Sequence, residues 1–151
     1  MPSVSVPTPN TSMLEAFIAF AWGGGDGVIR GPGTEAATVE TAPASLSVRV
    51  GAFKGFVSKR GIGLDAPQNT AAIVAPVGGS AGDLRRIDLV QWTLGVGLNV
   101  KAGAESGSPS APALDTDSIP IAHLYCRKGM VSVKTADDSS NGYIVDARVF
   151  R

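Results

Sequence analysis

Residues 86–101 read RIDLVQWTLGVGLNVK, and this stretch decides the fold class. In an extended strand, successive side chains point to opposite faces. Ile87 and Leu89 then lie on one face. Val90 and Trp92 lie on the other, so the first half of the stretch is apolar on both sides. A glycine interrupts the run, and apolar residues then return at every second position. The stretch therefore predicts a β-hairpin.

Short alternating runs of the same kind recur along the chain, separated by turns rich in glycine. Strands are expected at 46–50, 53–57, 70–77, 86–94, 96–101, 119–126, 131–135 and 143–150, with a weaker one at 38–41. Pro76 places the 70–77 strand near the edge or end of a sheet, because proline has no N–H to donate. About eight short strands at this spacing predict an all-β fold, either an antiparallel β-sandwich or an open barrel.

The N-terminal part of the chain has a different pattern. Residues 1–11 contain several prolines among small residues and are expected to form an extended arm. Ser12 and Glu15 have the spacing of a capping box, in which each residue's side chain accepts a hydrogen bond from the other's backbone N–H. A short apolar helix is therefore expected over 13–22, closed by the glycines that follow. A buried strand is the alternative, because large and small residues alternate in the second half of this segment.

The segment 13–22 carries large apolar side chains on every side of the expected helix, and such a helix must be buried all round. The residues in question are Met13, Leu14, Phe17, Phe20 and Trp22. Their cover comes either from the chain's own core or from neighbouring subunits, and the pattern leaves both open. We divide the chain into an assembly segment at 1–22, a glycine-rich loop at 23–44 and a β-sandwich-like module at 45–151.

The composition narrows the class of partner. Lysine plus arginine and aspartate plus glutamate number 13 each, so the formal net charge is zero, and charged residues make up 17% of the chain. A neutral chain without a basic cluster argues against nucleic acid and against an anionic membrane as partners. Near-zero net charge favours association between protein molecules. Cys126 is the single cysteine, which excludes an intramolecular disulfide.

Three motifs follow one another in the second half of the chain. They are Arg-Ile-Asp-Leu-Val at 86–90, Ile-Pro-Ile-Ala at 119–122 and Ile-x-Asp-x-Arg at 144–148, with a proline-containing loop and a glycine turn between them. Leu-Ser-Val-Arg-Val-Gly at 46–51 precedes them. In this order the motifs resemble a β-rich module that is common in bacteriophage virion proteins, mostly tail-fibre, baseplate and appendage proteins. The resemblance covers residues 38–151.

This resemblance implies a non-enzymatic structural protein of a phage particle, made in the host cytoplasm and located in the virion. It also implies a homo-oligomer, with a trimer favoured, whose partners are further copies and other virion proteins. The tail, baseplate or fibre region is the first expectation, and capsid decoration or a head-fibre protein is the alternative. A host-glycan-binding module is the alternative of a different class. On this interpretation neighbouring subunits cover residues 13–22, and no cofactor is implied.

Four charged residues are candidates for structural ion pairs. Arg86 and Asp88 lie two positions apart on one expected strand, and Asp146 and Arg148 lie two apart on another. If these strands are neighbours, Arg86 faces Asp146. Asp88 then faces Arg148. Cross-strand pairs of this kind contribute about 0.2–1 kcal/mol each and help to hold the register of the strands.

The sequence predicts no catalytic, cofactor or metal site. His123 is the single histidine and is expected to be a packed or surface residue. Cys126, three positions further along the same expected strand, points to the opposite face and is expected in the core. Asp137, Asp138 and Asn141 lack the alternating ligands of a calcium loop and are expected to form a turn.

Three aromatic residues, Trp92, Tyr125 and Tyr143, lie in expected strands. Together they are a candidate sugar-binding platform. Because all three lie within strands, we favour packing in the core.

Overall fold

The computed structural model describes residues 25–31, 35–78 and 84–151. These residues form eleven strands and no helix. The strands are β1 (Gly27–Val28), β2 (Thr38–Glu40), β3 (Val48–Val50), β4 (Phe53–Val57), β5 (Arg60–Leu64), β6 (Gln68–Asn69), β7 (Leu84–Thr93), β8 (Gly97–Lys101), β9 (Ser118–Arg127), β10 (Val133–Lys134) and β11 (Gly142–Asp146). The described part of the chain is therefore all-β and sandwich-like, whereas the expected number of about eight strands was too low.

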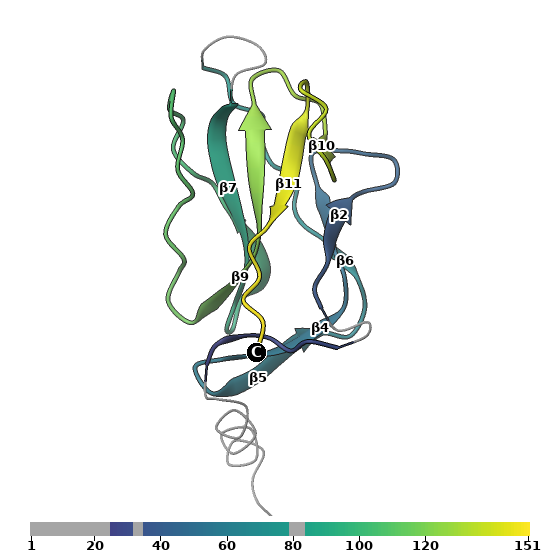
Figure 1. Ribbon diagram of the computed structural model, residues 1–151, viewed down its shortest axis with the longest axis vertical. Coiled ribbons are helices and arrows are strands. Elements are labelled where there is room, and N and C mark those ends of the chain that lie inside the picture. The colour runs from purple at the N-terminus through teal and green to yellow at the C-terminus, as the bar shows by residue number, and fades with distance from the viewer. Residues whose placement is uncertain (1–24, 32–34, 79–83) are drawn as a thin grey trace, which may run out of the picture.

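The largest sheet contains five strands in the order β10-β11-β9-β7-β8. Its neighbouring strands are antiparallel, except that β10 and β11 run parallel. The two longest strands, β7 and β9, have 10 residues each and lie side by side in the middle of the molecule (Figure 1). The hairpin predicted from residues 86–101 is confirmed, because β7 and β8 pair with Val90 opposite Val100 and Trp92 opposite Leu98.

A second sheet, in the order β2-β3-β6, lies beside β10 and β11 (Figure 1). The backbone N–H of Val133 donates to the carbonyl of Ser45 at 2.8 Å, which joins β10 to the loop before β3. The buried side chains of all three sheets form one core. Its fully buried apolar members include Val28, Val48, Val50, Phe53, Val57, Val90, Ile119, Ile121, Ala122 and Leu124.

The third sheet, in the order β1-β4-β5, lies across one end of the molecule (Figure 1). The C-terminal residues run along the free side of β1. The N–H of Val28 donates to the carbonyl of Val149 at 2.8 Å, and the N–H of Arg151 donates to the carbonyl of Val28 at 2.9 Å. Residues near the two ends of the described chain thus meet at this sheet.

A register shift in the central pair decides which residues of β9 enter the core. The β7–β9 register slips between Val90 and Gln91, so that Val90 lies opposite Ala122 whereas Gln91 lies opposite Pro120. The extra residue in β9 is Ile121, which is fully buried. A bulge of this kind lets residues that would otherwise alternate lie on the same face.

Residues 70–77, expected to be a strand, are extended but belong to none of the sheets. The segment leaves β3 after two backbone contacts, in which the N–H groups of Thr70 and Ile73 donate to the carbonyls of Val48 and Leu46, both at 2.9 Å. It then crosses to β7, where the guanidinium of Arg86 donates to the carbonyl of Val74. Its hydrogen bonds are thus divided between two sheets, which is why it forms no continuous ladder.

The expected helix at 13–22, and with it the interface residues Met13, Leu14, Phe17, Phe20 and Trp22, lies outside the described residues. The 23–44 stretch, expected to be a loop with a weak strand at 38–41, contains β1 as well as β2. Within the described ranges, no helix is long and apolar enough to cross a membrane.

Candidate functional site

A buried ion pair on β7 lies beside a groove in the described surface. The Nε of Arg86 donates to Oδ1 of Asp88 at 2.7 Å, and Nη2 donates to Oδ2 at 3.0 Å, which gives two parallel hydrogen bonds. Asp88 is 1% exposed and Arg86 is 9% exposed. A bidentate, charge-assisted pair of this kind is among the stronger polar contacts in proteins. The pair lines a groove whose other lining residues are apolar except Asn99.

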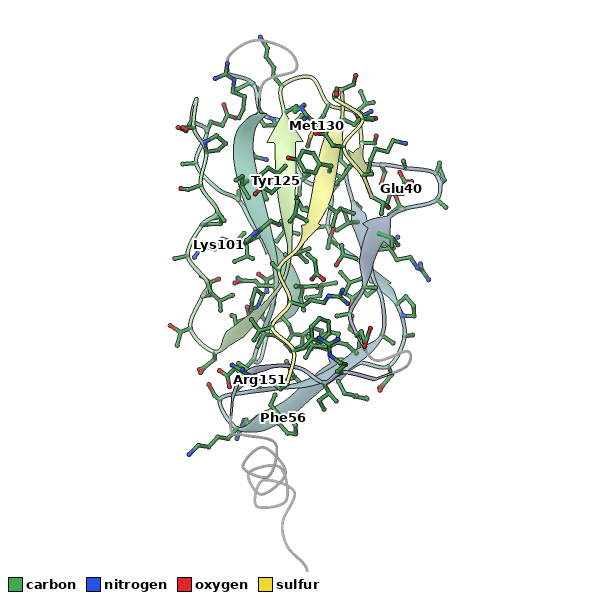
Figure 2. All side chains as sticks on the ribbon, viewed as in Figure 1. Glu40, Phe56, Lys101, Tyr125, Met130 and Arg151 are labelled. Carbon is green, nitrogen blue, oxygen red and sulfur yellow. The ribbon has the colours of Figure 1, made fainter. Side chains whose placement is uncertain are left out.

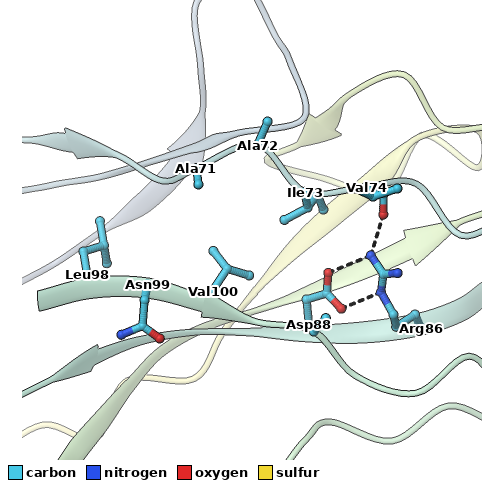
Figure 3. A pocket seen from close by; sticks show the side chains of 10 residues that line it. Ala71, Ala72, Ile73, Val74, Arg86, Asp88, Leu98, Asn99 and Val100 are labelled. Carbon is cyan, nitrogen blue, oxygen red and sulfur yellow. Dashed lines mark hydrogen bonds and ion pairs between the residues drawn. The ribbon is translucent and has the colours of Figure 1, made fainter. Parts of the chain in front are cut away.

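We call this groove the Val74 groove; it has a volume of about 420 Å³ and lies between residues 71–74 and the inner side of β7 and β8 (Figure 3). Its lining residues are Ala71, Ala72, Ile73, Val74, Arg86, Asp88, Leu98, Asn99, Val100 and Ala102. Figure 3 shows Leu98 and Val100 pointing from β8 toward the 71–74 segment, with the ion pair at one end of the groove. The groove therefore has the chemistry to accept apolar groups.

Asp88 also fastens two further segments. Its Oδ1 accepts the N–H of Gly103 at 3.0 Å, and Cys126 lies with Sγ 3.7 Å from Oδ2. Burial, followed by the nearby negative charge of Asp88, raises the pKa of the Cys126 thiol to about 12. Burial lowers the pKa of Arg86, but the hydrogen bond and charge of Asp88 outweigh it, so the net shift is upward. The guanidinium therefore stays charged, and the thiol stays protonated and unreactive.

The four charged residues form ion pairs, but the expected cross-strand partners were wrong. β7 and β11 both pair with β9 and lie on opposite sides of it, so Arg86 and Asp88 do not face the Asp146–Arg148 pair. Each arginine instead reaches the carboxylate two positions away in its own segment. The pairs therefore cannot fix a register between β7 and β11.

The second pair holds the end of β11 against the loop before β2. Arg148 donates from Nε to Oδ1 of Asp146 at 2.8 Å and from Nη2 to Oδ2 at 2.7 Å. Its Nη1 donates to the carbonyl of Glu35. The hydrogen bond from Arg148 lowers the pKa of Asp146 more strongly than burial raises it. The guanidinium also lies over the ring of Phe150, 4.8 Å from its centroid.

His123 and Cys126 lie on opposite faces of β9, as their spacing predicted. His123 pairs with Val145 on one side and Leu89 on the other and is half-buried. Burial lowers the pKa of the His123 imidazole, which favours its neutral form. Cys126 is fully buried in the core. The two side chains therefore cannot act as a base and nucleophile pair.

The aspartates after β10 form a turn. Oδ1 of Asp138 accepts the N–H groups of Ser140 at 2.9 Å and Asn141 at 2.7 Å, and Oδ2 accepts the side-chain amide of Asn141 at 2.8 Å. Asp137 pairs with Arg127 at 2.9 Å. In the part of the chain that the structure describes, no three histidine, cysteine or acidic side chains gather as metal ligands.

The three aromatic residues do not form one platform. Trp92 packs partly buried against the core, with its ring edge-on to Phe53 at a centroid distance of 5.5 Å. Tyr125 and Tyr143 lie opposite each other on β9 and β11, half-buried, with rings stacked at 4.9 Å. The guanidinium of Arg127 lies 5.2 Å from the centre of the Tyr143 ring. Core packing was therefore the right expectation for Trp92 but not for the tyrosine pair.

A polar network on the other side of the hairpin was not predicted from the sequence. Gln91 is fully buried, and its amide nitrogen donates to Asn99 at 3.0 Å and to Asp115 at 2.6 Å. Lys101 pairs with Asp115 at 2.5 Å. The network fastens the 102–117 loop to β7 and β8. The available signal was the pair of polar residues within the hairpin, Gln91 and Asn99, which lie opposite each other in the structure.

No family model matches the chain, and neither a curated protein nor a solved structure is significantly similar to it.

Proposed function

We propose that this chain is a non-enzymatic structural protein of a phage particle that assembles through subunit contacts in the tail, baseplate or fibre region. Its partners are further copies of itself, with a trimer favoured, and other proteins of the virion. Head decoration or a head-fibre role belongs to the same class and uses the same contacts.

One observation carries this proposal: the Val74 groove lies beside an open sheet edge. Among the described residues, β8 pairs with β7 alone, so one side of β8 has unpaired backbone groups. Val74 is 73% exposed, and Val77, three positions further along, is 79% exposed. An open strand edge beside an apolar groove is suited to another polypeptide, because main-chain hydrogen bonds and side-chain burial act together there.

The arrangement of the motifs lends further support. The Arg-Ile-Asp-Leu-Val motif lies on β7, Ile-Pro-Ile-Ala lies on β9, and Ile-x-Asp-x-Arg begins on β11. These three strands are consecutive in the five-stranded sheet. These three motifs therefore lie on adjacent strands of one sheet rather than in scattered loops, whereas the 46–51 motif includes β3 of the β2-β3-β6 sheet.

The mass of the protein in solution tests the proposal. We expect the full chain to sediment as an oligomer, with a trimer at three times the 15.4 kDa of one chain. We expect a chain lacking residues 1–22 to sediment as a smaller species, because the large apolar side chains at 13–22 contribute to the contacts. A full-length variant with Leu14→Ser and Phe17→Ser serves as a control for chain length and should behave like the truncation.

Circular dichroism establishes that each variant keeps its β-structure. A folded full-length chain that is monomeric at micromolar concentration would overturn the proposal. If the truncated chain had the mass of the full oligomer, residues 1–22 would not contribute to the assembly contacts.

The glycan-binding alternative has weaker support. A sugar-binding platform needs an accessible aromatic face. Tyr125 and Tyr143 already stack on each other, and Arg127 lies over Tyr143. Their geometry is therefore that of a packed pair, and we do not adopt this alternative.

A further inference from the structure

The β1-β4-β5 sheet has a second apolar side, facing away from the core. Phe53 and Val57 of β4 are fully buried on the core side. Phe56 directly precedes Val57 in the strand, so its side chain points to the opposite side of the sheet. Figure 2 shows Phe56 at the end of the molecule, far from Met130. Phe56 is nevertheless only 7% exposed. We call this side of the sheet, carrying Ile29, Lys54, Phe56, Gly61 and Gly63, the Phe56 face.

The Phe56 face contains a groove that the glycines of β5 leave open. Gly61 pairs with Phe56 and Gly63 pairs with Lys54, so the two positions beside these side chains carry none of their own. The groove has a volume of about 400 Å³ and is lined by Ile29, Lys54, Gly55, Phe56, Gly61, Ile62 and Gly63. Lys54 is its one charged lining residue and already pairs with Asp65 at 2.5 Å. The groove is therefore suited to apolar side chains.

The path of the chain brings a specific apolar segment to this groove. The carboxylate of Asp26 accepts the backbone N–H of Ser58, in the β4–β5 turn, at 2.8 Å. The chain thus enters β1 beside β4 and β5. Residues 13–22 are separated from Asp26 by the three glycines at 23–25. The four Cα–Cα steps from Trp22 to Asp26 span roughly 14 Å at most, so the end of the apolar segment cannot lie far from the Phe56 face of its own subunit.

We propose that the Phe56 face is the docking site of residues 13–22 of the same chain. Side chains of the segment fill the groove beside Gly61 and contribute to the cover of Phe56. A groove contacts only one side of a segment, and every residue of this segment except Glu15 is apolar. Its remaining apolar residues then face neighbouring subunits, and this last step rests on the proposed function.

Disulfide trapping tests the docking site. One cysteine replaces Gly61, and a second replaces Ala16, Ala19 or Ala21 in turn, in the full chain. Cys126 can remain, because its thiol is buried and unreactive. Two cysteines form a disulfide only when their Cα atoms come within about 7 Å. We expect at least one pair to form a disulfide within a single chain under mild oxidation, seen as a linked peptide pair by mass spectrometry.

The matched control places the fixed cysteine at Lys128, an exposed position in the turn after β9. We expect these control pairs to form no disulfide within the chain. The proposal is overturned if no cysteine pair that includes position 61 forms more disulfide within the chain than the control pairs. It is also overturned if these pairs form disulfides only between two chains. If the Gly61→Cys variant fails to fold, Lys54→Cys replaces it on the same face.

Failure of this inference is distinguishable from failure of the proposed function. A disulfide within one chain forms whether the protein is a monomer or an oligomer. A monomeric protein that forms this disulfide would therefore support the docking site and overturn the assembly function. An oligomer that forms no such disulfide would support the assembly function and overturn the docking site.

Discussion

Asp88 is a carboxylate that joins three segments of the chain. It accepts two hydrogen bonds from Arg86, accepts one from Gly103 and touches Cys126. Arg86 in turn binds the carbonyl of Val74, so the pair connects β7 with the segments on both sides of it. Removing charges from water is costly, and a buried pair is stable only when its remaining polar atoms have partners. Here those partners are backbone groups of the neighbouring segments.

The first prediction concerns this pair. We expect Asp88→Ala to lower the free energy of unfolding by about 3 kcal/mol or more, because Arg86 keeps its charge in a buried position without a counter-ion. Urea denaturation followed by circular dichroism measures the change. Asp65→Ala removes the exposed partner of Lys54 and is the matched control, with little expected effect. If both variants lost the same stability, the Asp88 pair would not have the structural role assigned to it.

The sheet pairings explain why similar sequence patterns form different elements. Residues 70–77 have the alternation of a strand, yet they end as an extended bridge between β3 and β7. Residues 119–126 have the same pattern and form the centre of the largest sheet as part of β9. The difference lies in their neighbours: β9 has strands on both sides, whereas the 70–77 segment meets two sheets in succession. Extended segments become strands only where a partner runs alongside.

A second prediction concerns the turn at 137–141. Hydrogen bonds from Asn141 and Ser140 lower the pKa of Asp138 to about 2. In the unfolded chain this pKa is about 3.9, so on acidification the unfolded state takes up the proton first. The stabilisation from Asp138 is therefore complete above about pH 5 and is lost as the pH falls toward 2.

We expect the thermal midpoint of the Asp138→Asn variant to fall less between pH 5 and pH 2 than that of the natural chain. Thermal unfolding at several pH values, followed by circular dichroism, measures this difference. Parallel curves for the two proteins would mean that the hydrogen bonds of the turn do not stabilise the charged form of Asp138.

Two of the grooves on the described part of the molecule are lined mainly by apolar residues. The Val74 groove lies beside the open edge of β8, and the Phe56 face lies at the end where the described chain begins. The first is suited to contact with another molecule, and we assign the second to the chain's own N-terminal segment. The first surface, on a chain without net charge, supports the proposed self-association.

The last prediction is made at this scale. We expect the double variant Val74→Ser and Val77→Ser to weaken self-association by about tenfold or more. Each substitution removes an apolar side chain that the proposed subunit contact would bury. Sedimentation over a range of concentrations measures the association constant. Val131→Ser is the matched control, because Val131 is 76% exposed but lies between β9 and β10, outside the 71–77 segment. An equal effect of the control, or no effect of the double variant, would remove the Val74 groove from the subunit contacts.

The sequence by itself determined the all-β class, the β7–β8 hairpin and the burial of Cys126, because these follow from alternation within a few consecutive residues. Only the tertiary structure decided that β9 lies between β7 and β11, and with it which charges pair. It also decided the bridging path of residues 70–77 and the burial of Gln91 beneath the 102–117 loop. The physical reason is that strand order depends on how distant segments pack, and a local pattern of apolar residues is compatible with several such arrangements.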